Sequence, residues 1–164
     1  MQTGPVQIRA PDAAAVRTAL DVLREHGSSG GDIPVGAVVI GPDGGVIGQG
    51  WNQRTDTADP TAHAEIVALR DAAHRLHSWR LTGCTLAITL EPCPMCAGAA
   101  AAARIDRVVF GAWNPDYGAA GSLFDLLRDP RLPNRCEVVG GVLVEECRAP
   151  IEAFFARRRA VPPG

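Results

Sequence analysis

Two short segments of the chain carry residue types that suit metal-dependent chemistry. The first is His63-Ala64-Glu65 and the second is Pro92-Cys93-Pro94-Met95-Cys96. One imidazole and two thiolates are ligands that zinc prefers, and three protein ligands leave the fourth tetrahedral position to water, as in catalytic zinc sites. The pattern therefore predicts one zinc ion per chain, held by His63, Cys93 and Cys96.

Glu65 is the candidate acid–base group of this site. Zinc lowers the pKa of a bound water to about 7, but a hydrolytic reaction must also move protons, which a carboxylate beside the metal can carry. Residues two apart do not share a face of a regular helix, so His63 and Glu65 can act on one ion only if a helix begins near them. Asp59-Pro60-Thr61 is a helix start signal at that place.

A C-x-x-C pair alone is also typical of redox sites and of half a structural zinc site. A structural site needs no proton carrier and closes with a fourth protein ligand, so Glu65 argues against a non-catalytic zinc module. The combination of H-x-E with a later P-C-x-x-C is the signature of zinc-dependent nucleobase deaminases. The remaining thiols are predicted to be buried and structural, and the remaining histidines to lie on the surface near helix ends: Cys84, Cys136, Cys147, His26, His74 and His77.

Composition limits the classes that remain. The chain has 164 residues, of which 46% are hydrophobic and 21% charged, which predicts one globular domain over residues 11–160 after a flexible tail over residues 1–10. The net charge of -2 provides no global positive field, so any RNA contact must come from local arginines. No secretory signal and no apolar run of membrane-spanning length is evident, so we expect a cytoplasmic protein without a membrane partner.

The hydrophobic pattern predicts helices and strands in the order α-β-β-α-β-α-β-α-β-α. Strands are expected at 35–40, 46–51, 84–90, 108–110 and 138–144, and helices at 11–27, after Thr61, from Pro94 to about 104, at 123–128 and at 145–159. This order favours an α/β fold, a three-layer α/β/α sandwich with a five-stranded mixed sheet. Both metal segments would then begin helices, whose free backbone amides carry partial positive charge.

The segments 59–66 and 89–99 are similar to the zinc segments of the bacterial tRNA-specific adenosine deaminases, a family of the cytidine and deoxycytidylate deaminase superfamily. The resemblance continues through residues 34–38, 50–52, 107–112, 118–123 and 154–155. It implies a cytidine-deaminase-like fold, a homodimer, and hydrolytic conversion of adenosine to inosine at the wobble position of an arginine tRNA anticodon loop, with release of ammonia.

Carried over residue by residue, the resemblance implies that His63, Cys93 and Cys96 bind zinc and that Glu65 shuttles protons. The same resemblance implies a substrate pocket completed by these residues: Asn52, Ala64, Asn114, Tyr117 and the backbone of Cys93. It also implies RNA contacts from arginines in the last third of the chain: Arg131, Arg135 and the run 157–159.

The chain departs from the family pattern at residues 113–117 and 133–135, where the RNA-editing members usually meet RNA. These departures leave the metal motifs intact. They keep a second substrate class open, a free nucleobase or nucleoside such as guanine or cytosine, which would need no phosphate groove and would suit the acidic net charge.

Overall fold

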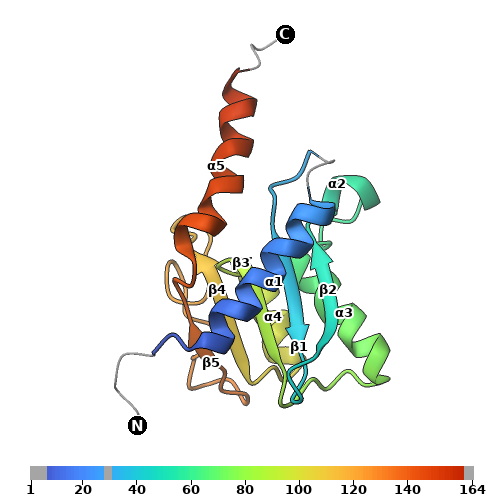
Figure 1. Ribbon diagram of the computed structural model, residues 1–164. Helices are drawn as coiled ribbons and strands as arrows, with labels where there is room; N and C mark the ends of the chain where they lie inside the picture. The colour runs from blue at the N-terminus through green and yellow to red at the C-terminus, as the bar shows by residue number, and fades with distance from the viewer. Residues whose placement is uncertain (1–6, 28–30, 161–164) are drawn as a thin grey trace.

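A five-stranded mixed sheet forms the centre of the protein in the computed structural model, which describes residues 7–27 and 31–160 (Figure 1). The strands are β1 (Gly36–Ile40), β2 (Val46–Trp51), β3 (Thr85–Leu90), β4 (Arg107–Ala112) and β5 (Glu137–Val139), in the spatial order β2-β1-β3-β4-β5. Strand β1 pairs antiparallel with β2 and β3, whereas β4 pairs parallel with β3 and β5. The predicted five-stranded mixed sheet is confirmed.

Helices cover both faces of this sheet, as the predicted sandwich requires (Figure 1). The helices are α1 (Ala10–His26), α2 (Arg54–Thr57), α3 (Ala64–Leu76), α4 (Pro94–Ala102) and α5 (Val144–Ala160). Helices α1 and α5 pack on one face, and α3 and α4 cluster with the side chains of the other. None of the helices in the described part of the chain has the length and apolar composition needed to cross a membrane.

Alternation along the central strands produces the two faces. On β1, Val38 packs with Ala19 of α1, whereas its neighbour Val39 packs with Ala68 of α3. Successive side chains of a strand point to opposite faces, so a strand that is apolar throughout serves both layers. The core is therefore divided by the sheet.

Two glycines of β2 allow α3 to lie directly on the sheet. A Cβ atom at Gly50 would collide with the backbone of Ala64, and one at Gly48 would collide with the backbone of Ala68. The absence of a side chain at both positions brings the helix axis close to the strand. This contact sets the position of the first turn of α3, where His63 and Glu65 lie.

The prediction of a helix over residues 123–128 is wrong. That segment consists of turns with a single bridge between Ala120 and Asp125. Leu123 and Phe124 are both more than half exposed, and only Leu127 is buried, so the segment has no apolar face to press against the sheet.

The last predicted strand is too long, because β5 ends at Val139 and α5 begins at Val144. Two glycines lie between them. A Cβ at Gly140 would collide with the Phe110 ring, and Gly141 has a φ of 79°, which favours glycine.

Two other boundaries differ from the prediction. The expected polar loop after β2 contains the short helix α2, and α4 ends at Ala102, before the predicted boundary.

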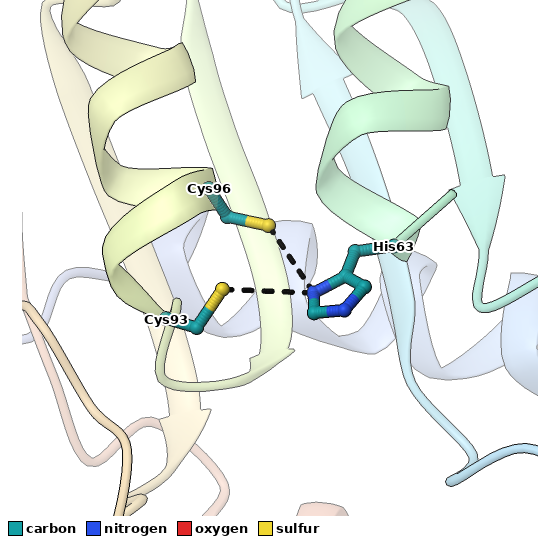
Figure 2. Close-up of side chains that lie close together, drawn as sticks. All are labelled: His63, Cys93 and Cys96. Carbon is teal, nitrogen blue, oxygen red and sulfur yellow. Dashed lines mark hydrogen bonds between the residues drawn. The ribbon is translucent and has the colours of Figure 1, made fainter. Parts of the chain in front are cut away.

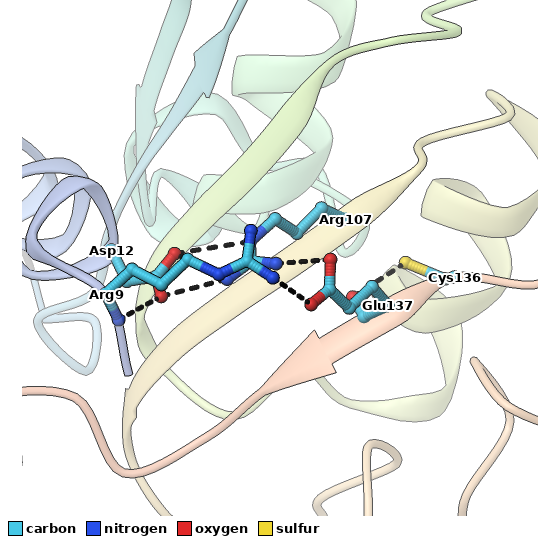
Figure 3. A network of polar contacts seen from close by, with 5 residues as sticks. All are labelled: Arg9, Asp12, Arg107, Cys136 and Glu137. Carbon is cyan, nitrogen blue, oxygen red and sulfur yellow. Dashed lines mark hydrogen bonds and ion pairs between the residues drawn. The ribbon is translucent and has the colours of Figure 1, made fainter. Parts of the chain in front are cut away.

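An ion-pair network ties α1 to the amino ends of β4 and β5 (Figure 3). Arg107 donates from its Nη2 atom to both carboxylate oxygens of Asp12, at 2.7 and 2.9 Å, and also pairs with Glu137. Arg9 pairs with Glu137 at 3.2 Å and precedes the first turn of α1. Residues 1–6 of the predicted tail lie outside the described residues, and Arg9 within it takes part in the fold.

Candidate active site

The candidate metal ligands lie where two helices begin at the same end of the sheet. His63 is the N-cap residue of α3 and Cys93 that of α4, both with extended backbone, and Cys96 lies in the first turn of α4. Asp59 stabilises the approach to α3, because its Oδ1 atom accepts hydrogen bonds from the Thr61 amide at 2.8 Å and the Thr61 hydroxyl at 2.7 Å. The two helix starts are confirmed by the structure.

The three side chains converge on one point (Figure 2). The Nδ1 atom of His63 lies 3.6 Å from the Sγ of Cys93 and 3.5 Å from the Sγ of Cys96, and all three ligand atoms lie within 4.8 Å of one another. Tetrahedral zinc with ordinary Zn–S and Zn–N bond lengths separates sulfur from nitrogen by about 3.6 Å. The donor types and their spacing therefore fit a zinc ion.

The protonation of the cluster favours metal binding. Hydrogen bonding from Cys96, together with His63, lowers the pKa of the Cys93 thiol to about 4. The same hydrogen bond to Cys93, together with burial, raises the pKa of Cys96, and hydrogen bonding to Cys93 raises the pKa of His63. The cluster therefore holds a thiolate at Cys93 and a proton on Cys96, and a bound metal ion would displace that proton.

Glu65 lies in the first turn of α3, two residues after His63, and its side chain is 5% exposed. Burial raises the pKa of Glu65 to about 7, against the smaller opposing effect of His63. A carboxyl group with a pKa near neutrality can both accept and return a proton during one reaction cycle. The geometry thus places an acid–base group beside the cluster.

A cavity of about 690 Å³ opens in front of the cluster. Seven of the eight predicted site residues line it: Asn52, His63, Ala64, Glu65, Cys93, Asn114 and Tyr117. Cys96 is fully buried behind the cavity wall. The structure therefore brings the predicted residues together around one space.

Asn52 presents a free hydrogen-bond acceptor in this region. Its Nδ2 atom donates to the carbonyl oxygen of Ile33 at 3.0 Å, which fixes the orientation of the amide. Its Oδ1 atom is buried and has no hydrogen-bond partner among the described residues. Buried polar atoms are nearly always paired in folded proteins, so this acceptor is open to a partner that the described residues do not supply.

The cavity is also lined by residues that were not predicted as site residues: Arg54, Glu91, Trp113, Arg148 and Phe155. Of these, Arg54 and Arg148 lie outside every segment in which the chain resembles the family pattern or departs from it. Arg54 is held at the mouth by the buried carboxylate of Asp32, which lies 3.7 Å from its Nε atom. By contrast, Arg131 pairs with Asp129 and Arg158 donates to the carbonyl of Gly31, and neither lines the cavity. Arg54 and Arg148 lie 94 positions apart in the sequence, so no local pattern indicates that they share one cavity.

Comparison with known proteins agrees with this geometry. Residues 10–112 match the family described as the cytidine and deoxycytidylate deaminase zinc-binding region. A tRNA-specific adenosine deaminase from Haemophilus influenzae is 45% identical over 156 residues, which cover 90% of each chain.

Solved structures of deaminases also match the chain. One from a study of A-to-I editing by tRNA:A34 deaminases is 35% identical, with a TM-score of 0.70, and the match covers 85% of this chain and 94% of that one. Guanine deaminase from Bacillus subtilis is 32% identical with a TM-score of 0.59, over 92% of this chain and 96% of that one. The chain belongs to the cytidine and deoxycytidylate deaminase family and, within it, to the tRNA-specific adenosine deaminases.

Proposed function

We propose that the protein hydrolyses adenosine to inosine at the wobble position of a tRNA, with one zinc ion per chain held by His63, Cys93 and Cys96. The observation that carries the proposal is the convergence of these ligands, Glu65 and the free Asn52 acceptor on one cavity. The 45% identity to a tRNA-specific adenosine deaminase, across nearly all of both chains, supports the choice of substrate.

Each group has a separate part in this reaction. Zinc, when bound, acts as a Lewis acid that makes a water nucleophile available at neutral pH. Glu65 would carry one proton from the attacking water to a ring nitrogen of the base, and a second proton from the hydroxyl group so formed on the base to the departing amine, which leaves as ammonia. Asn52 accepts a hydrogen bond from the bound nucleotide through Oδ1 and holds it against the cavity wall.

The residues at the mouth of the cavity favour a substrate nucleotide that is part of an RNA strand. A deaminase reaches a base in RNA only after the base leaves its stack, and its neighbours then need aromatic and cationic partners. Tyr117 is 63% exposed and Phe155 40% exposed at this mouth. Arg54 and Arg148 line it as well, on α2 and α5, where they pair with Asp32 and Glu145. Each guanidinium has five N–H donors, so donors remain for a phosphate.

The arginine tRNA and the homodimer implied by the resemblance, and the cytoplasmic location expected separately, form part of the same proposal. An assay panel tests the substrate: an arginine tRNA with adenosine at the wobble position, the same tRNA with guanosine there, and free adenosine, guanine and cytosine. We expect inosine only in the first tRNA, with activity that falls as salt rises, because phosphate contacts are screened. Nucleoside analysis by mass spectrometry measures the product.

Variants at the mouth refine this test. Arg54→Ala and Arg148→Ala should raise KM for the tRNA without changing zinc content, whereas Arg17→Ala, which breaks an exposed pair between α1 and α5, should leave KM unchanged. Salt-insensitive release of ammonia from guanine, without inosine in the tRNA, would overturn the proposal in favour of a free-base deaminase.

A further inference from the structure

Glu91 is a buried carboxylate beside the site with no part in the chemistry described above. It follows β3 directly and precedes Pro92-Cys93, and it is 1% exposed. The residue nevertheless contributes to the cavity wall. Charged side chains are almost never fully buried without partners, so its contacts explain its presence.

All the hydrogen bonds to its carboxylate come from one segment, residues 113–122, here called the wall loop. Oε1 accepts from the amides of Ala120, at 3.1 Å, and Ser122, at 2.9 Å. Oε2 accepts from the amide of Asn114, at 2.9 Å, and from the Ser122 hydroxyl. One side chain therefore holds both ends of the loop.

The wall loop forms a side of the cavity. Five consecutive residues, 113–117, line it, and they include Asn114, whose amide Glu91 binds. The loop also wraps the metal segment, because the Ala119 amide donates to the carbonyl of Pro92 at 2.8 Å. At Gly118 a Cβ atom would collide with the Glu91 carboxylate, which shows how closely the loop encloses it.

Only a carboxylate suits this position. It has two acceptor oxygens with about four lone-pair sites, which match the three amides and one hydroxyl that point at Glu91. A glutamine amide has the same shape but presents an NH2 group to two of these donors. Since a buried donor without an acceptor is costly, one end of the loop would then separate from the side chain.

We propose that Glu91 is a positioning residue that sets the affinity for the nucleotide by holding the wall loop against the cavity. The proposal rests on the proposed function, since the loop is taken to contact the substrate. Glu91 acts through the loop, while zinc binding and proton transfer stay with the cluster and Glu65. Its loss should therefore change KM more than kcat.

The test compares Glu91→Gln with Asp12→Asn, which also removes a buried acceptor but lies in the network at the other end of the sheet. We expect Glu91→Gln to keep its zinc and to raise KM for the tRNA by roughly tenfold, the scale of one lost hydrogen-bonded contact, with a smaller change in kcat. Asp12→Asn should lower the melting temperature and leave KM unchanged. Zinc analysis and steady-state kinetics measure both variants.

Hydrogen exchange gives a readout that does not depend on activity. In Glu91→Gln the amides of Asn114, Ala120 and Ser122 should exchange faster than in the unaltered protein, whereas those of β3 should not. Ser122→Ala removes only the hydroxyl donor and should give a smaller change in the same direction, which keeps the test open if Glu91→Gln does not fold.

Two results would overturn the proposal. One is an unchanged KM in Glu91→Gln with full zinc content. The other is loop exchange that rises equally in Asp12→Asn, which would mean a general loss of stability. Absence of tRNA deamination in the unaltered protein would instead overturn the proposed function, and the exchange experiment would still report on the wall loop.

Discussion

The two ends of β3 and β4 carry polar clusters of opposite character. At the amino end, where Thr85 pairs with Arg107, two arginines and two carboxylates neutralise one another (Figure 3). At the carboxyl end, where Leu90 pairs with Ala112, the strands lead to two thiols and an imidazole, which are metal-ligand types (Figure 2). The first cluster pairs opposite charges within the chain, and the second gathers metal-ligand side chains.

Within one sheet, the amino-end cluster stabilises the fold, whereas the carboxyl-end cluster is suited to function. Arg107 is 12% exposed and bound on two sides, so its cluster joins α1 to two strands and needs nothing from outside. Cys93, Cys96 and His63 hold each other only by weak contacts of 3.5 and 3.6 Å, and they adjoin a cavity. A cluster of metal-ligand side chains with perturbed pKa values beside a cavity is the one suited to bind a ligand.

Loss of a thiolate should have the largest effect. Cys96→Ala removes one of three zinc ligands, so we expect the purified variant to contain little zinc and to show no measurable deamination. Cys147→Ala is the matched control, because Cys147 is equally buried but packs against α1 and β4 away from the cluster, and it should retain zinc. Full zinc occupancy in Cys96→Ala, by elemental analysis, would show that the ligand assignment is wrong.

Removal of the acid–base group should come next. Glu65→Gln keeps the size of the side chain but cannot exchange protons, so kcat should fall by about 10²–10⁴-fold while zinc content and melting temperature stay near those of the unaltered protein. Zinc loss in this variant would place Glu65 among the ligands. Near-normal turnover would assign proton transfer to another residue.

The pH dependence of metal binding is a third, smaller effect. In the metal-free chain Cys93, with a pKa of about 4, is already a thiolate at neutral pH, whereas Cys96 keeps its proton. Zinc binding must displace that proton, together with any proton on His63, whose pKa is also raised, so affinity should rise by at least about tenfold per pH unit through the neutral range. Competition with a coloured chelator measures affinity, and a pH indicator measures proton release. An affinity independent of pH would contradict this protonation scheme.

The smallest effect on catalysis should come from the opposite cluster. Asp12→Asn leaves Arg107 with Glu137 alone, which should lower the free energy of unfolding by about 2 kcal/mol without changing kcat. Arg17→Ala, which breaks an exposed pair with Glu146 at 3.1 Å, should cost less than about 1 kcal/mol. Urea unfolding measures both. A large fall in kcat for Asp12→Asn would show that the two ends of the sheet are coupled.

The sequence alone determined the features that depend on neighbours along the chain. Alternation and helix periodicity predicted the five strands and the main helices, since these patterns record which face of an element is buried. The start signals Asp59-Pro60-Thr61 and Pro92-Cys93-Pro94 placed His63 and Cys93 at helix ends. Ligand type and spacing then indicated zinc and the acid–base part of Glu65.

Tertiary structure alone decided the features that depend on residues far apart in the sequence. The helix predicted at 123–128 failed because its apolar residues are turned to solvent, and the last strand stopped early because Gly140 must pass the Phe110 ring. Glu91 became visible as the support of the cavity wall only when residues up to 31 positions away reached its carboxylate. Local sequence patterns reflect burial and backbone preference, whereas these contacts form only when folding brings residues that are distant in the sequence close together.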